Sequence, residues 1–144
     1  MIALLQKSRA TFALFAILSG LLAGCSGMMM MGQKQALSGD QEVPPVMTSA
    51  SGTGNITIAS DMSVTGGVTT TGMAGTAAHI HMAVAGKNGP VIVPFTKTGD
   101  NQWSVPTGAK LTDAQYKAYL AGELYVNVHS DAHKGGEIRA QLKP

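Results

Sequence analysis

The chain has 144 residues, with ten basic and eight acidic side chains, a formal net charge of +2 and one cysteine. One cysteine excludes an intramolecular disulfide, so folding must rely on an apolar core and on any metal that is bound. The nearly balanced charge includes no cluster of Lys or Arg, which argues against nucleic acid as a partner.

Residues 1–24 have the features of an export signal. Lys7 and Arg9 precede an apolar run that ends at Gly24, directly before Cys25. The run is too short, and too closely followed by polar sequence, to span a bilayer as a mature helix. Its end, Leu-Leu-Ala-Gly-Cys, resembles a bacterial lipobox, which implies cleavage before Cys25 and lipidation of its thiol. The alternative is an ordinary secretory peptide that is followed by a chance cysteine.

The lipobox resemblance sets the expected location. Acyl chains on Cys25 would anchor the protein in the bacterial cell envelope, and two or more chains hold a protein firmly on a membrane. Ser26 follows the cysteine and favours the outer membrane. Without Lys7 and Arg9 the mature chain has eight basic and eight acidic residues, so the lipid rather than protein charge would hold it there.

Residues 25–36 are expected to be a lipidated tether ahead of a folded body at 37–144. The tether contains four consecutive methionines, Met28 to Met31. Because thioethers bind Cu(I), this tract is either a transient copper ligand or simply a biased linker. The body has the size of one domain.

The first half of the body predicts short β-strands. Residues 50–73 are rich in Thr, Ser, Gly and β-branched residues, and Ile56 and Ile58 alternate with polar neighbours. Residues 79–84 and 90–97 predict two more strands, joined across an Asn-Gly turn. Prolines at the start and within the second of these confine it to a sheet edge or a strand start.

Residues 113–120 predict a single helix. Thr112 and Gln115 form a capping box at its start, because each side chain can bond a free backbone N–H of the other residue. Gly122 is suited to end the helix, since glycine readily adopts the left-handed conformation found there.

The clearest hairpin closes the chain. Leu124, Val126 and Val128 share one face of its first strand, residues 138–142 alternate in the same way, and the segment SDAHKGG joins the two. With the shorter strands before it, this hairpin predicts an all-β fold, a β-sandwich or Greek-key barrel with one short helix.

Three separated segments of the body resemble the CHRD (chordin) domain. They are LSGDQEVPPV at 37–46, AAHIHMAVAGKNGPVIVPF at 77–95, and LTDAQYKAYLAGELYVNVHSDAHKGGEIRAQL at 111–142. The resemblance implies an immunoglobulin-like β-barrel outside the cytoplasm. In animals the domain occurs in a secreted antagonist of growth-factor signalling, but function belongs to sites rather than folds, so that activity is not transferred.

All four histidines of the chain fall in two close pairs, His79 with His81 and His129 with His133. Side chains alternate across a strand, so His79, His81 and His129 are expected to point away from the aliphatic face. His133 lies in the connecting turn, where the chain can curve back toward His129. Four neutral imidazoles suit Cu(II) or Zn²⁺, and copper stands higher in the general affinity order, so copper is the favoured metal and zinc the alternative.

Three polar residues near the second pair can assist such a site. Asp131 and Glu137 are candidate ligands, or they orient the imidazoles by hydrogen bonds, as Asn127 also can. The alternative is structural, because histidines near strand ends often bond buried carbonyls while Asn127 and Glu137 complete a polar network.

Function therefore stays open between three classes. The leading hypothesis is a lipid-anchored envelope protein that binds copper or zinc for storage, buffering or delivery. The alternative is a non-catalytic adhesion or interaction module with an unidentified envelope partner. A metal-dependent redox enzyme is the third and least favoured class, because it needs an open coordination position, and the serines show no Ser-His-acid pattern that would indicate other catalysis.

Overall fold

A computed structural model describes residues 33–144 of the chain. The expected export signal, Cys25 and the Met28 to Met31 tract therefore lie outside the described residues. Within residues 33–144, no helix is long and apolar enough to cross a membrane.

The described chain is built of short strands with one α-helix. In chain order its elements are β1 (Gln35–Ser38), the 3₁₀ turn η1 (Gly39–Gln41), β2 (Ser51–Gly54), β3 (Thr57–Ile58), β4 (Val64–Thr65), β5 (Gly67–Thr71), β6 (Gly75–Met82), β7 (Val91–Pro94), β8 (Thr96–Gly99), β9 (Gln102–Ser104), α1 (Asp113–Leu120), β10 (Leu124–Ser130) and β11 (Ile138–Leu142). Because β1 begins at Gln35, the last two residues of the expected tether are part of the sheet.

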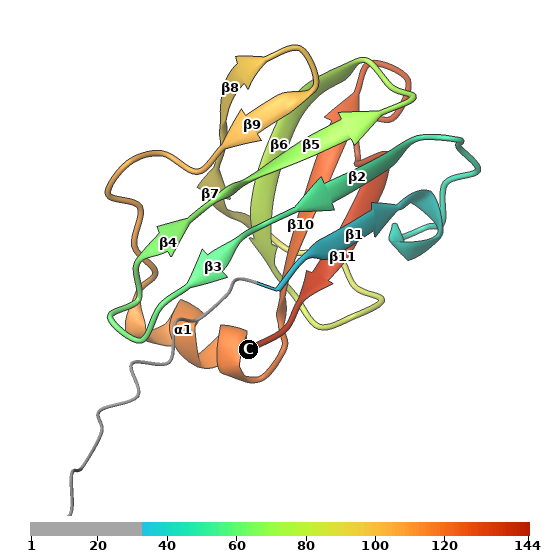
Figure 1. The fold of residues 1–144 in the computed structure, drawn as a ribbon. Coiled ribbons are helices and arrows are strands. Elements are labelled where there is room, and N and C mark those ends of the chain that lie inside the picture. The colour runs from blue at the N-terminus through green and yellow to red at the C-terminus, as the bar shows by residue number, and fades with distance from the viewer. Residues whose placement is uncertain (1–32) are drawn as a thin grey trace, which may run out of the picture.

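Nine of the strands form one antiparallel sheet that curls into a nearly closed barrel. Its order is β7-β6-β10-β11-β1-β2-β5-β9-β8, and β3 pairs only with β4. Figure 1 shows β1, β2 and β5 in front of β6, β10 and β11, with α1 at the lower end. The predicted all-β fold with one short helix is confirmed, and so is the position of β7 at a sheet edge.

The barrel interior is filled by the aliphatic faces of these strands. Leu124, Val126 and Val128 on β10 have no exposed surface, and Ile80 on β6 and Ile138 on β11 are equally buried beside them. Trp103 fills the space against Gly75, where a side chain of any size would collide with the indole ring. The predicted alternation of the last hairpin is therefore confirmed.

The start and stop signals of α1 are also confirmed. The Thr112 hydroxyl accepts from the Gln115 backbone N–H, and the Gln115 side chain accepts from the Thr112 N–H, which completes the capping box. Gly122, just past the helix, has a φ of +72°. These interactions are local, which is why the sequence alone predicts them.

The other face of β6, β10 and β11 is more enclosed than strand alternation predicts. Tyr125, Asn127 and Arg139 point away from the barrel interior, yet each has at most 2% of its surface exposed. The loop between β6 and β7 covers them: the Arg139 guanidinium donates to the Lys87 carbonyl at 3.0 Å and to the Asn88 side-chain oxygen at 3.4 Å. A small polar layer is therefore buried outside the barrel.

A second segment helps to cover this layer. The Asn88 amide donates to the Val43 carbonyl at 2.7 Å, which joins the β6–β7 loop to the segment that follows η1. Glu42 in this segment is itself buried, with 4% of its surface exposed. The QEVPP stretch, residues 41–45, thus covers part of the polar layer.

Candidate metal centre

Three of the four histidines converge on the outer face of β6 and β10. In the register between these strands Asn127 pairs with His79 and Tyr125 with His81, while His129 follows Asn127 by two residues on the same face. One ring nitrogen from each of His79, His81 and His129 lies within 4.8 Å of the others. Their convergence depends on the register of two strands that are far apart in the sequence.

Backbone hydrogen bonds hold two of the three rings in a ligand-ready orientation. His81 Nδ1 donates to the Gly89 carbonyl at 3.0 Å, and His129 Nδ1 donates to the Lys134 carbonyl at 2.9 Å. A carbonyl can only accept, so a neutral ring in either position has its proton on Nδ1 and a lone pair on Nε2. Metal-binding histidines commonly have their second ring nitrogen fixed in this way.

The third ring, His79, forms a hydrogen bond with His129 in the absence of a metal. His79 Nδ1 lies 3.0 Å from His129 Nε2. Because His129 carries its proton on Nδ1, its Nε2 must accept, and the neutral His79 ring donates from Nδ1. For His79 to bind a metal ion through Nδ1, its proton would move to Nε2, and the ring would stay neutral.

Burial lowers the pKa of two of the three imidazoles, His79 and His81. Burial, followed by the neighbouring His129 and His81, lowers the pKa of His79 from 6.5 to about 4. Burial also lowers the pKa of His81, although the hydrogen bond to Gly89 acts in the opposite direction. The lowered pKa values favour the neutral form of these two rings, which is the form that binds a metal ion.

The site is open on one side. His81 is 7% exposed, whereas His79 and His129 are half-buried. His81 Nε2 is buried and has no hydrogen-bond partner among the described residues. The cluster thus has a buried, unbonded nitrogen on His81, and solvent reaches it at His79 and His129.

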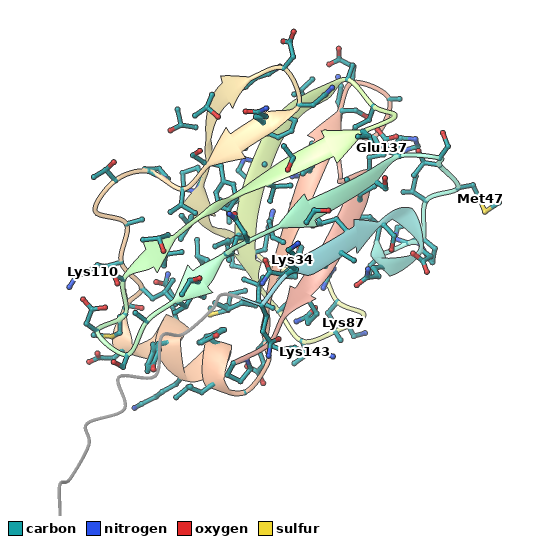
Figure 2. The ribbon with its side chains drawn as sticks, in the orientation of Figure 1. Lys34, Met47, Lys87, Lys110, Glu137 and Lys143 are labelled. Atoms are coloured by element: carbon teal, nitrogen blue, oxygen red, sulfur yellow. The ribbon has the colours of Figure 1, made fainter. Side chains whose placement is uncertain are left out.

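The remaining predicted residues lie at different distances from this cluster. His133 is in the turn after β10, where its backbone N–H bonds Ser130, and it is not part of the three-histidine set. Asp131 is exposed in the same turn. Glu137 is buried and accepts from the Thr48 hydroxyl at 2.7 Å, near the loop that carries Met47 (Figure 2). Asn127, in contrast, lies directly beside His79.

Glu42 also belongs to the site region, although no sequence pattern predicted it there. Burial raises the pKa of Glu42 to about 7, although Arg139 and a hydrogen bond from Asn127 act to lower it. Through Asn127 this carboxyl is connected to the face that carries the histidines. The QEVPP motif was a signal for this residue, but nothing in its spacing indicates contact with a strand more than eighty residues later.

Tyr125 and Arg139 were not predicted from the sequence either. Tyr125 packs against His81, and Arg139 packs against Tyr125. The Tyr125 ring stacks on His81 with centroids 4.8 Å apart and planes 5° apart. The Arg139 guanidinium carbon lies 3.3 Å from the Tyr125 ring centroid, on a cation–π contact. This stack fixes the plane of the His81 imidazole.

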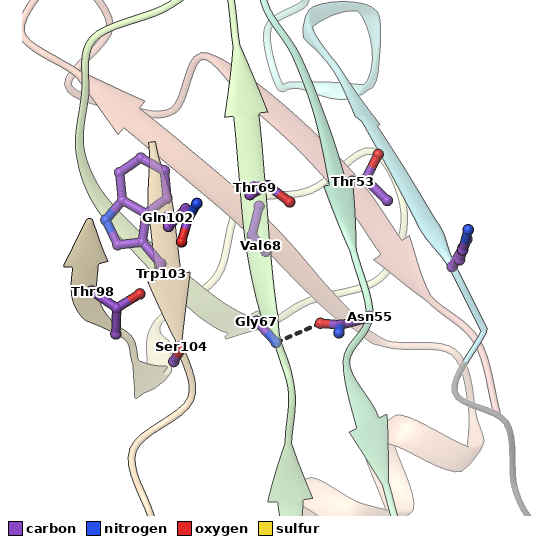
Figure 3. A pocket seen from close by; sticks show the side chains of 10 residues that line it. Thr53, Asn55, Gly67, Val68, Thr69, Thr98, Gln102, Trp103 and Ser104 are labelled. Carbon is purple, nitrogen blue, oxygen red and sulfur yellow. Dashed lines mark hydrogen bonds between the residues drawn. The ribbon is translucent and has the colours of Figure 1, made fainter. Parts of the chain in front are cut away.

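Several cavities of the described residues lie away from the histidines. One has a volume of about 330 Å³ and is lined mainly by Thr, Ser, Asn and Gln side chains. Figure 3 shows these residues, among which Asn55 accepts from the Gly67 N–H at 2.8 Å. Another, of about 470 Å³, is lined by Glu42, Val43 and Arg139 among others. Neither of these two cavities is lined by a histidine.

Comparison with known proteins identifies the family of this fold. No curated protein and no solved structure matches the chain. The profile of the CHRD domain matches residues 34–142, which include every strand from β1 to β11 and all four histidines. The chain belongs to the CHRD domain family.

Proposed function

We propose that this CHRD-domain protein binds one transition metal ion through His79, His81 and His129, and that it stores, buffers or delivers that ion. The observation that carries the proposal is the pair of Nδ1–H groups fixed by backbone carbonyls. They leave the lone pair of His81 Nε2 unbonded and direct that of His129 Nε2 at His79. Hydrogen bonds of this kind are what a metal-binding imidazole needs to hold its tautomer.

The separations of the ring nitrogens suit a small ion. Imidazole nitrogen binds zinc at about 2.0–2.1 Å, so tetrahedral ligands stand about 3.4 Å apart. His79 Nδ1 and His129 Nε2 are 3.0 Å apart, and no pair in the cluster exceeds 4.8 Å. Opening the first contact slightly and closing the widest separation by about 1.4 Å, which side-chain movement can supply, would complete the geometry.

Copper is the first choice of metal and zinc the second. An all-imidazole set suits both ions, and Cu(II) binds more tightly than Zn²⁺ to a given nitrogen site. Cysteine thiolates, which would favour Cu(I) or zinc, are absent from the described residues. In the cell we place the protein in the envelope, anchored to the outer membrane by lipid on Cys25, so the metal would be handled outside the cytoplasm.

Metal titration of the purified chain tests the proposal. We expect one Cu(II) or Zn²⁺ per chain, and a rise in unfolding free energy of about 2.7 kcal/mol when free metal is one hundred times the dissociation constant, because the folded state alone has the site. Chelation should reverse this stabilisation. Calorimetric titration and thermal unfolding with and without EDTA provide the two measurements.

Histidine variants locate the site. We expect His79→Gln and His129→Gln each to weaken binding by more than the roughly 10- to 100-fold that loss of a hydrogen bond to a ligand costs. His133→Gln is the matched control, because His133 is outside the three-histidine set. Loss of binding in His133→Gln alone, or no stoichiometric binding by the unchanged chain, would refute the proposal and leave the histidines with a structural role.

A further inference from the structure

Buried side-chain atoms without partners occur in the histidine cluster and in residues next to it. Among the described residues, five buried side-chain nitrogen or oxygen atoms have no hydrogen-bond partner, and three of them are Glu42 Oε1, His81 Nε2 and Asn127 Oδ1. Buried polar groups are nearly always bonded, so a local excess of unbonded atoms calls for an explanation. The metal proposed above would satisfy His81 Nε2, but it leaves Asn127 Oδ1 without a partner.

Asn127 lies between the three histidines on the outer face of β6 and β10. It is opposite His79 in the register of β6 and β10, two residues before His129, and diagonal to His81 across the Tyr125 pair. Opposed side chains on neighbouring strands have Cβ atoms about 4.5–5.5 Å apart, and diagonal ones about 7–8 Å. An ion held by all three imidazoles would therefore lie close to the Asn127 side chain.

The orientation of the Asn127 amide is set from its other side. Its nitrogen and the Glu42 carboxyl both lie within 2.8 Å of the point where a Cβ on Gly136 would be. The nitrogen thus faces Glu42, and this interaction acts to lower the pKa of the carboxyl. Because the NH₂ group is used toward Glu42, the oxygen is the end that remains free. Asn127 also lies close enough to His81 for its oxygen to favour the charged form of that ring.

We propose that Asn127 Oδ1 accepts a hydrogen bond from a fourth ligand of the metal. This ligand must carry a proton. It is water in the resting protein, and alcohols and amines belong to the same class. The inference rests on the proposed function, since it needs the metal. An amide oxygen can only accept, so it selects against ligands that have no proton to donate, such as azide. The site is then an exchangeable one rather than a closed structural site.

Pulsed electron paramagnetic resonance of the Cu(II)-loaded chain in D₂O tests the first part. We expect the strongly coupled exchangeable deuterons of a coordinated water. Copper content is measured on the same sample, so the two proposals fail separately: absence of bound copper overturns the proposed function, whereas one copper per chain without a coordinated water overturns only the role of Asn127. This measurement uses the unchanged chain, so it is decisive even where a variant does not fold.

Azide competition tests the hydrogen bond itself. Loss of one hydrogen bond to the water should let azide bind roughly 2- to 12-fold more tightly in Asn127→Leu. Thr70→Val is the matched control, because Thr70 Oγ1 is also buried without a partner but lies on β5, which pairs with neither histidine strand. Equal azide affinity in Asn127→Leu and the unchanged chain would overturn the inference, as would the same gain in Thr70→Val.

Discussion

Gly136 occupies a position that only glycine fits without strain. Its φ is +128°, and an added Cβ would meet both the Glu42 carboxyl and the Asn127 amide. We expect Gly136→Ala to lower the unfolding free energy by about 1–3 kcal/mol, because it forces a side chain into a conformation that L residues rarely adopt. It should also weaken metal binding, since Asn127 would be displaced from beneath the histidines. Denaturant unfolding and copper titration measure the two effects.

Gly135 is the matched control for this substitution. A Cβ there meets nothing within 4 Å, although the residue is the immediate neighbour of Gly136. Gly135→Ala should therefore change the unfolding free energy by no more than about 0.5 kcal/mol. Equal losses in the two variants would show that flexibility of the turn, rather than contact with Glu42 and Asn127, explains the effect.

At the scale of the element, α1 tests whether the fold and the site are energetically separate. Thr112→Ala removes the hydroxyl that accepts the Gln115 N–H and should cost about 1 kcal/mol of unfolding free energy. Thr112→Ser retains the hydroxyl and should cost much less. Copper affinity should be unchanged in both variants, because α1 contributes no residue to the histidine cluster. A fall in copper affinity would contradict this separation.

Elements whose signals are local were predictable from the sequence, and the site was predictable only in part. The capping box at Thr112 and the alternation of Leu124, Val126 and Val128 act within a few residues, so their patterns predicted α1 and β10. The set of His79, His81 and His129 depends on strand register, which pattern alone leaves undetermined. The burial of Asn127 comes from loops that fold over the sheet, and sequence alternation gives no sign of such long-range contacts.

At the scale of the whole molecule, two buried groups give opposite pH dependence. The folded chain keeps His79 neutral, with a pKa of about 4 against an ordinary 6.5, so its contribution to stability is lost as pH falls through this interval. The folded chain holds the proton of Glu42, with a pKa of about 7 against an ordinary 4.5, so that contribution is lost as pH rises from 4.5 to 7. Over most of this range the two effects oppose each other.

Glu42→Gln should separate the two contributions. The variant cannot ionise at this position, so its unfolding free energy relative to the unchanged chain should increase as pH rises from 4.5 to about 7, and then stay constant. Chemical unfolding in the presence of EDTA, at several pH values from about 5 to about 8, measures this difference. A difference that is independent of pH would show that Glu42 is ionised throughout the range.

The edge strands β7 and β8 follow one another in the chain, with Phe95 alone between them. An open sheet usually exposes two separate rows of unpaired amides, and each can template the addition of another chain. Here the two edge strands, β7 and β8, are neighbours in the chain, so both sheet edges lie close together. Pro94 on β7 lacks an amide proton, and Lys97 on β8 is exposed and charged. Proline and lysine on an edge both discourage intermolecular strand pairing. Pro94 and Lys97 should therefore limit aggregation by strand pairing between copies of the protein at high local concentration.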